Sequence, residues 1–292
     1  MPVDFRYHLA SLTAVFGALL IGILLGVAMM EPRHLSAQVH KLTEDFQRSH
    51  EEDQHIQLQL QLQRDLDKRI DQFNERTQAP LIRNRLANHN VALVINAFVF
   101  PEDRIDAVRQ ALEQAGAAVT VQITLKAGLL QVEPDQIQGI YQQLQLPAET
   151  KMNISDLIYR LGQNLGRGGT KLADILQQAQ LVDINNINGD LTTPVSSIIY
   201  LGGSSDSPLD ALNTIDLPFL RACADSDVLI AATEPLEASK SVVADYQKVV
   251  PITIDNINHA AGRIALILAL SGHRRGHFGY KQYADDVAPD TE

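Results

Sequence analysis

Residues 9–30 read LASLTAVFGALLIGILLGVAMM, an apolar run without a charged side chain. At 1.5 Å per residue, a helix of about 22 residues spans roughly 30 Å, the thickness of the hydrocarbon core of a bilayer. A signal peptide usually has a shorter apolar region, of about 7–15 residues, before a cleavage site of small residues. We therefore expect a short tail at residues 1–8 and an uncleaved transmembrane helix at residues 9–30, with cleavage after Ala28 as the alternative.

Small residues recur at every fourth position of this run, which places them close to one face of a helix. Such a face allows two helix backbones to approach closely in a membrane, so we expect it to mediate dimerisation. The residues of this expected membrane dimer face are Ala14, Ala18, Gly22 and Gly26.

Lysine and arginine are nearly balanced on the two flanks of the run, with Arg6 on one side and Arg33 and Lys41 on the other. The positive-inside rule therefore does not decide the orientation. We expect a single-pass protein of the cell membrane with a cytoplasmic N-terminus and an extracytoplasmic bulk.

Residues 33–79 are polar and lack glycine and proline, and apolar residues follow 4-3-4 spacing from Leu35 to Phe46, are replaced by Ser49 and Asp53 at the next seam positions, and resume at Ile56. This heptad spacing predicts a coiled-coil stalk, and so a homodimer or a higher parallel oligomer. A phase shift between His55 and Leu62 indicates a stutter, and Pro80 is expected to end or kink the helix. The alternative is a single polar helix packed on its own domain. The expected seam consists of Leu35, Val39, Leu42, Phe46, Ile56 and Leu60.

The net charge of −11 argues against nonspecific binding to nucleic acid or to anionic lipid. The chain has one cysteine, Cys223, so it cannot form an intramolecular disulfide. Cys223 falls on a predicted helix, and we expect a buried structural thiol there rather than a nucleophile.

Residues 88–280 alternate short apolar runs with segments of helical spacing. This alternation predicts an α/β fold: an open, mostly parallel, Rossmann-like sheet covered by helices on both faces. Residues 281–292 form an acidic tail, of which we expect residues 285–292 to be disordered. The predicted strands are 91–99, 118–125, 196–201, 227–232 and 250–254, and the predicted helices are 102–114, 134–144, 154–177 with an interruption at 166–169, 237–248 and 258–270.

The loop after the third predicted strand is a candidate ligand site, because ligands of open parallel sheets bind outside the carboxyl ends of the strands. Its candidate residues are Gly202, Gly203 and Ser204. The alternative is a tight turn that needs glycine, since the first strand–helix turn has no glycine and no dinucleotide fingerprint is present. Glu234 and Asp255 follow two later strands, where carboxylates suit acid–base chemistry. No nucleophile is paired with a base by spacing, so we expect no enzyme and assign no catalytic residue.

His273 and His277 lie four positions apart and could share a metal ion on a helix, although Gly272 and Gly276 disfavour a helix there. Histidines of the stalk, such as His50 and His55, could form a weak copper or zinc site, because imidazole suits both metals. Solvated stalk histidines are the simpler alternative.

Two segments resemble the MctB-type copper transport proteins. One is the opening VDFRYHLASLTAVFGALLIGILLG, and the other is the closing TIDNINHAAGRIALILALSGHRRGHFGYK with its Gly276-His277-Phe278-Gly279 loop. The order of anchor, coiled coil and α/β domain is also similar. The resemblance implies a role in copper transport or homeostasis at the cell envelope, with copper as a possible bound ion.

A pore is physically difficult for this chain, because one helix offers no polar conduit and nothing in the sequence alternates as barrel strands do. Cysteine and methionine, the usual ligands of copper(I), are also scarce. A non-catalytic scaffold or regulator of envelope enzymes, acting through a protein partner, is therefore the second hypothesis. A ligand-binding Rossmann-like domain is the third.

Overall fold

The computed structural model describes residues 5–29, 32–97, 100, 102–146, 153–203, 210–226, 228–238, 240–281 and 284–289. Two compact units make up the chain. The first covers Met1–Asp67 and the second covers Lys68–Glu292, so the boundary falls inside a long helix.

Helix α1, Phe5–Met29, contains the segment Tyr7–Ala28, which is long and apolar enough by length and composition to cross a membrane. The described side chains of this segment are exposed in the single chain, and a Cβ added at Gly22 or Gly26 would meet no atom within 4 Å. The expected small-residue face is thus open, as association of two such helices would need.

Helix α2 runs without a break from Pro32 to Ile82, so Pro80 lies in its last turn and the helix ends two residues beyond it. The seam residues whose side chains are described are exposed, from 47% at Leu60 to 74% at Phe46. The side chains of Leu35 and Val39 lie outside the described part. The predicted long helix is confirmed, whereas the pairing of two such helices remains a prediction.

The described strands of the second unit form one seven-stranded sheet in the order β3-β2-β1-β4-β5-β6-β7. All neighbouring pairs are parallel except β2 and β3. The predicted α/β class with an open, mostly parallel sheet is therefore confirmed. The strands are β1 Asn90–Asn96, β2 Ala118–Leu125, β3 Val182–Asn186, β4 Ser197–Leu201, β5 Leu229–Thr233, β6 Ile252–Ile254 and β7 Gly276–Phe278.

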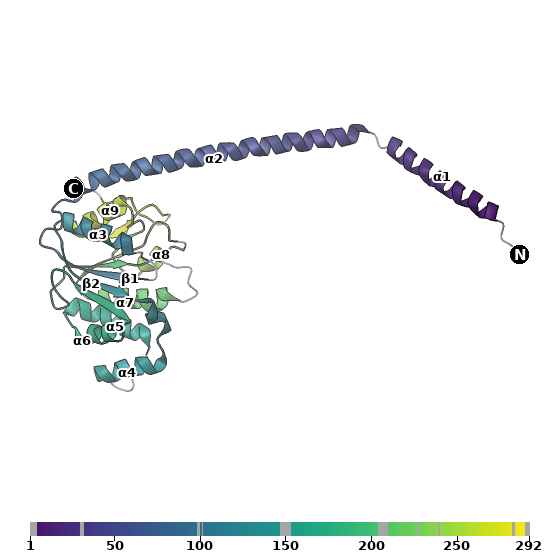
Figure 1. The fold of residues 1–292 in the computed structure, drawn as a ribbon. Helices are drawn as coiled ribbons and strands as arrows, with labels where there is room; N and C mark the ends of the chain where they lie inside the picture. The colour runs from purple at the N-terminus through teal and green to yellow at the C-terminus, as the bar shows by residue number, and fades with distance from the viewer. Residues whose placement is uncertain are drawn as a thin grey trace. The chain divides into compact units, whose positions relative to one another are not determined.

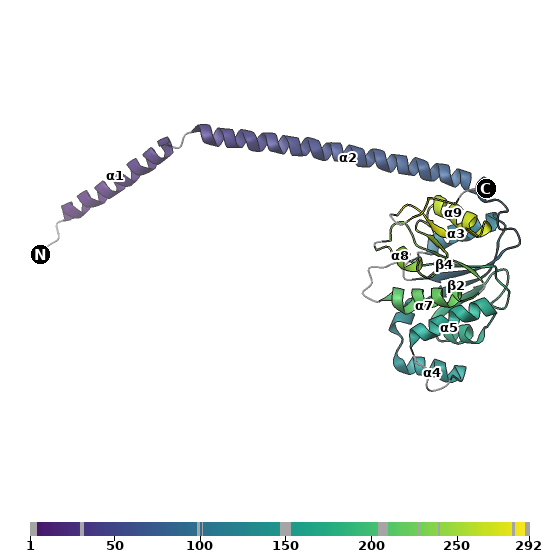
Figure 2. The ribbon, with the colours of Figure 1, turned by 180° about the vertical axis from the view of Figure 1, so that it is seen from behind.

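Helices cover both faces of this sheet, with α3 and α9 on one side and α5, α6 and α7 on the other (Figures 1 and 2). Alternate residues of β1 explain the two layers: Ala92 and Val94 join one apolar cluster, and Val91, Leu93 and Ile95 join the other. The helices are α3 Glu102–Gln114, α4 Pro134–Leu144, α5 Ile154–Arg167, α6 Lys171–Gln178, α7 Leu217–Ala224, α8 Val243–Tyr246 and α9 Ala260–Ser271, with a π-helical turn at Leu212–Asp216 before α7.

Two short edge strands were not predicted. β3 carries three polar residues in VDINN, and β7 consists of three residues beginning with a glycine, so neither has a strong strand pattern. The helix predicted over 237–248 was wrong in extent, because within the described residues only α8, Val243–Tyr246, is α-helical there. The backbone N–H of Val242 instead donates to the Glu234 carboxylate, which fixes the segment before α8 as a loop.

The acidic C-terminal segment was expected to lack structure, but its described residues 284–289 attach to the sheet. The Asp285 N–H donates to the His277 carbonyl at 2.7 Å, and the Asp285 carboxylate accepts from the His277 N–H at 2.8 Å. Asp286 also forms an isolated parallel bridge with Phe278. Backbone pairing with β7 thus orders a segment whose composition alone predicts disorder.

Candidate functional site

The carboxyl ends of four neighbouring parallel strands meet at one edge of the sheet. Asn96 ends β1, Gly202 follows β4, Glu234 follows β5 and Asp255 follows β6. This placement confirms that the carboxylates at positions 234 and 255 lie at strand ends. Ligands of open parallel sheets bind at this edge, so its polar groups decide what the domain can do chemically.

Asp216 forms a buried cluster beside the ends of β1 and β4. Its carboxylate accepts hydrogen bonds from the Asn96 amide at 2.8 Å and from the hydroxyls of Tyr200 and Tyr246 at 2.5 Å each. The carboxyl group is fully buried, and burial raises its pKa to about 6 even though the three donors act in the opposite direction. Burial, followed by the charge of Asp216, raises the pKa of both tyrosines well above the usual value, so they remain donors.

Gly202 and Gly203 lie against this cluster rather than around an open cradle. A Cβ at Gly202 would lie 2.5 Å from the Tyr246 hydroxyl oxygen and 2.6 Å from the Tyr200 ring, so close packing requires glycine. Gly203 has a φ of 128°, and its N–H donates to the Tyr246 hydroxyl at 3.1 Å. The described glycines therefore fit the tight-turn alternative, and Ser204 lies outside the described residues.

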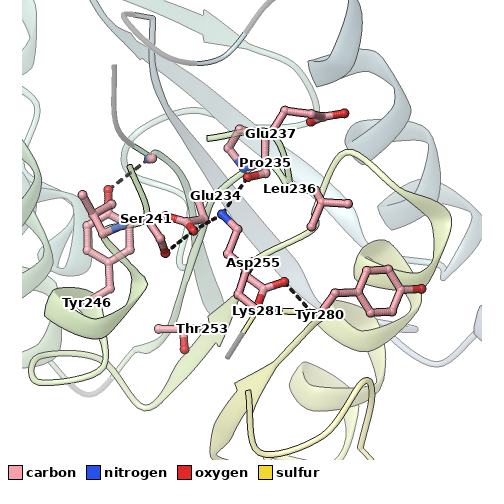
Figure 3. Close-up of polar contacts among 12 residues, drawn as sticks. Glu234, Pro235, Leu236, Glu237, Ser241, Tyr246, Thr253, Asp255, Tyr280 and Lys281 are labelled. Atoms are coloured by element: carbon pink, nitrogen blue, oxygen red, sulfur yellow. Dashed lines mark hydrogen bonds and ion pairs between the residues drawn. The ribbon is translucent and has the colours of Figure 1, made fainter. Parts of the chain in front are cut away.

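Glu234 is the centre of a second buried cluster (Figure 3). Its carboxylate accepts from the Ser241 hydroxyl at 2.5 Å and from the Val242 N–H at 2.9 Å, and it forms a close ion pair with the Lys281 ammonium. The same ammonium donates to the Pro235 carbonyl at 3.2 Å. Lys281 thereby ties the segment after β7 to the end of β5.

Asp255 receives the backbone of that same segment. Its two carboxylate oxygens accept from the N–H groups of Tyr280 and Lys281, both at 2.8 Å. A Cβ at Gly279, where φ is 151°, would lie 2.0 Å from Asp255 Oδ1, so only glycine allows the loop to close on the carboxylate. Burial alone would raise the pKa of Asp255, but the His277 imidazole and the two N–H donors outweigh it and lower the pKa.

Thr253, His277 and Asp255 are arranged like a hydroxyl, an imidazole and a carboxylate in a nucleophilic relay. The Thr253 hydroxyl lies 2.8 Å from His277 Nδ1, and His277 Nε2 lies 3.2 Å from Asp255 Oδ2, within ion-pair range but outside hydrogen-bond geometry. All three side chains are buried, with Thr253 only 1% exposed. A substrate could not reach the hydroxyl without local opening, so the geometry is that of an internal brace.

The structure separates the two histidines that were considered as a metal pair. His273 lies in an exposed turn with a φ of 48°, whereas His277 is buried in β7, so they do not share a helix face. Within the described part of the chain, no group of three or more His, Cys, Asp or Glu side chains is arranged to hold a metal ion.

Cys223 is fully buried in α7, as expected for a structural thiol. Its sulfur lies 3.8 Å from the Gly162 carbonyl oxygen, and burial raises the pKa of the thiol. A thiol kept neutral and away from solvent is a poor nucleophile.

The last turns of α2 are bound to the start of α9 by Arg263, which is 3% exposed. Its guanidinium donates to the Gln78 side chain at 3.0 Å, to Glu75 at 2.5 Å and to the Asn258 carbonyl at 2.9 Å. His259 Nδ1 lies 3.1 Å from Asp71 Oδ1 on the same face of α2. These last turns of α2 therefore pack on the α/β domain. For this stretch alone, the structure agrees with the alternative of a polar helix packed on its own domain.

Sequence reasoning found Glu234 and Asp255 but missed Asp216, Lys281 and Arg263. Asp216 could have been noticed as a single carboxylate within the apolar stretch LNTIDLPFL, and Arg263 as the one charged residue of the helix AAGRIALILALS. Lys281 had no such signal, because its partner Glu234 lies far away in the sequence.

Comparison with known proteins places this chain in a family. Residues 2–289 match the family described as "Copper transport outer membrane protein, MctB". The chain is also 25% identical over 316 residues to proteins named "Copper transporter MctB" from Mycobacterium bovis and from two strains of Mycobacterium tuberculosis, covering 95% of this chain and 96% of each relative. The chain belongs to the MctB copper transport family.

Proposed function

We propose that this MctB-family chain serves copper homeostasis at the cell envelope as a membrane-anchored dimer that presents its α/β domains from a coiled-coil stalk. The observation that carries the proposal is the family match over residues 2–289, joined to one apolar helix and a stalk with exposed apolar residues. Association of two copies would remove this apolar surface from water.

The α/β domain acts without catalysis in this proposal. Asp216, Glu234 and Asp255, three described carboxylates near the carboxyl ends of the strands, are each occupied by several hydrogen-bond donors of the same chain. A general acid or base must instead meet a substrate within hydrogen-bond reach. This occupancy supports a structural role for the three carboxylates.

In this proposal the α/β domain lies on the extracytoplasmic side and the N-terminus in the cytoplasm. Protease treatment of intact cells tests this orientation. A full-length protein tagged at its C-terminus should lose the tag when the outer face of the membrane is accessible, and protection until the membrane is permeabilised would reverse the assignment.

Copper binding by this chain would show that it handles copper itself, as the family's role in copper transport suggests. Titration of the full-length protein in mild detergent with copper(I), in competition with a chromogenic chelator, should show stoichiometric binding. Of the candidate ligands, His273, His50 and His55 are exposed, so His273→Ala and His50→Ala with His55→Ala are the informative variants, whereas His277 is enclosed. Binding no tighter than that of the buffer would remove direct copper handling from the proposal.

A scaffold for other envelope proteins is the second candidate, favoured by the occupied polar edge together with the exposed apolar residues of the stalk. Affinity capture of the tagged full-length protein should then recover an envelope protein. Leu60→Asp, which places a charge in the seam, should abolish that capture, and recovery of the same proteins by this variant would count against a stalk-dependent scaffold.

A further inference from the structure

A hollow of about 650 Å³ opens at the opposite edge of the sheet, where the parallel strands begin. Its lining includes the residues immediately before four neighbouring strands: Ser196 before β4, Val228 before β5, Pro251 before β6 and Arg275 before β7. The hollow is therefore separate from the carboxyl-end clusters, and it has the size of a small-molecule site.

Basic side chains gather around this hollow although the chain as a whole carries a net charge of −11. Arg275 and His273 come from the turn between α9 and β7, and Lys248 comes from the turn after α8. None of the described lining residues is acidic, and within the described part of the chain Arg275 forms no ion pair. Asp227, between two lining residues, lies outside the described residues.

Among the described residues, Lys248 is the one member of the trio with an ion-pair partner, at 2.7 Å from Asp245 Oδ1. The Lys248 side chain is 71% exposed and that of Asp245 is 41% exposed, so water screens the pair and its strength is small. An incoming anion can therefore compete with Asp245 for the ammonium, while Arg275 offers its donors without such competition.

The remaining lining is mixed: Ser196, Ser226 and Gln247 lie beside an apolar wall that includes Leu229, Val249 and Pro251. A basic rim beside an apolar wall suits a molecule with an anionic head and a less polar body. Guanidinium and ammonium groups bind phosphate oxygens through charge-assisted hydrogen bonds. The volume also exceeds what an inorganic phosphate alone would fill.

We propose that this hollow binds a small organic phosphate, whose phosphoryl oxygens contact Arg275, His273 and Lys248 and whose organic part lies on the apolar wall. Of its three basic residues only His273 is also a proposed copper ligand, so Arg275 and Lys248 separate this site from copper binding, and the site does not require stalk pairing. It would give the α/β domain a ligand at the amino-end edge of its sheet.

Calorimetric titration of the full-length protein in non-ionic detergent with adenosine diphosphate and with inorganic pyrophosphate tests the proposal. Arg275→Gln and His273→Gln should each weaken binding of adenosine diphosphate by roughly tenfold, as expected for loss of a hydrogen bond to a charged group. Arg85→Gln removes one exposed arginine outside the hollow and should leave binding unchanged.

Adenosine diphosphate should bind more tightly than pyrophosphate if the apolar wall contributes. Equal affinities would overturn the role of the wall. Absence of binding for both probes, or an equal affinity in the wild type and in Arg275→Gln, would overturn the site itself. Thermal unfolding followed by circular dichroism verifies that each variant is folded, which is expected because the substituted side chains are exposed.

Discussion

The stalk helix α2 and the α/β domain place side chains in opposite environments. In the first unit, α2 leaves Leu42, Phe46 and Ile56 more than half exposed, whereas the domain encloses Asp216, Glu234 and Asp255 completely. Each buried carboxylate has its donors within the same chain, but the apolar side chains of the stalk have no such cover. This difference is what the proposed pairing of two stalks would account for.

This contrast predicts that substitutions in the domain change the free energy of unfolding, whereas substitutions in the stalk change the mass of the assembly. The effect on the free energy of unfolding should be largest at the Lys281–Glu234 ion pair. It should then decrease through the Asp216 cluster and Gly202 to the exposed seam of the stalk.

Lys281→Met should have the largest effect, because it leaves the Glu234 carboxylate buried without its cation. Removing one partner of a buried ion pair costs about 3–5 kcal/mol. Urea unfolding of the full-length protein followed by circular dichroism measures the loss. Combining Lys281→Met with Glu234→Gln should recover part of it, and a loss below about 1 kcal/mol would show that the pair is not closed in solution.

Asp216→Asn should change the pH dependence of unfolding. Burial raises the pKa of Asp216 from 3.8 to about 6, so the folded state holds this proton more tightly than the unfolded state. The stabilising effect of this proton is complete below the pKa of Asp216 in the unfolded state, and it is lost as the pH rises through about 6. Unfolding measured between pH 4 and pH 7 should therefore show a decline of about 2–3 kcal/mol in the wild type that the variant lacks.

Asp255 has the opposite pH dependence. Its pKa is lowered in the folded state, so its contribution to the free energy of unfolding falls as the pH drops below the pKa of the unfolded state. The difference between the wild type and Asp216→Asn isolates one carboxyl group. Parallel pH profiles for the two proteins would contradict the assignment to Asp216.

Gly202→Ala should destabilise the domain by about 1–3 kcal/mol, because the added methyl group would overlap the hydroxyl of Tyr246 and the ring of Tyr200. Gly139→Ala is the matched control, since Gly139 lies in α4 and a Cβ there meets no atom within 4 Å. The control should stabilise by roughly 0.5–1 kcal/mol, as expected for alanine in a helix. A thermal melt that ranks the two variants in the reverse order would exclude close packing at Gly202.

Leu60→Asp should have the smallest effect on unfolding, within about 0.5 kcal/mol, because the side chain is exposed in one chain. It should instead reduce the mass of the detergent-solubilised protein from that of two chains to that of one. Leu58→Asp is the matched control, because Leu58 is also exposed but lies about 160° from the seam around the helix. Light scattering that gives both variants the same mass would contradict the seam.

The sequence predicted the parts of the fold that local pattern determines. The 22-residue segment Tyr7–Ala28 and the 12-residue helix α9 are both strongly apolar, yet the first is exposed and the second is buried. Length separates them, because about 20 residues are needed to span a bilayer and a shorter apolar helix belongs to a core. The alternation of strands and helices likewise gave the parallel sheet.

Features that depend on distant partners were not predictable. β7 forms because its three residues pair with β6, and residues 284–289 are ordered because they bind β7. The candidate site shows the same limit, since spacing placed Glu234 and Asp255 at strand ends but gave no sign that Lys281 and its neighbours would occupy them. The helix predicted over 237–248 was wrong in extent for a related reason, since the Val242 N–H donates to the Glu234 carboxylate.

Cysteine cross-linking in native membranes tests the pairing of stalks most directly, because the chain's single cysteine, Cys223, is buried. Leu60→Cys should form a disulfide-linked dimer under mild oxidation, and Leu58→Cys on the opposite face of α2 should remain largely monomeric. Failure of Leu60→Cys to cross-link, or equal cross-linking at both positions, would contradict a parallel stalk paired along the predicted seam.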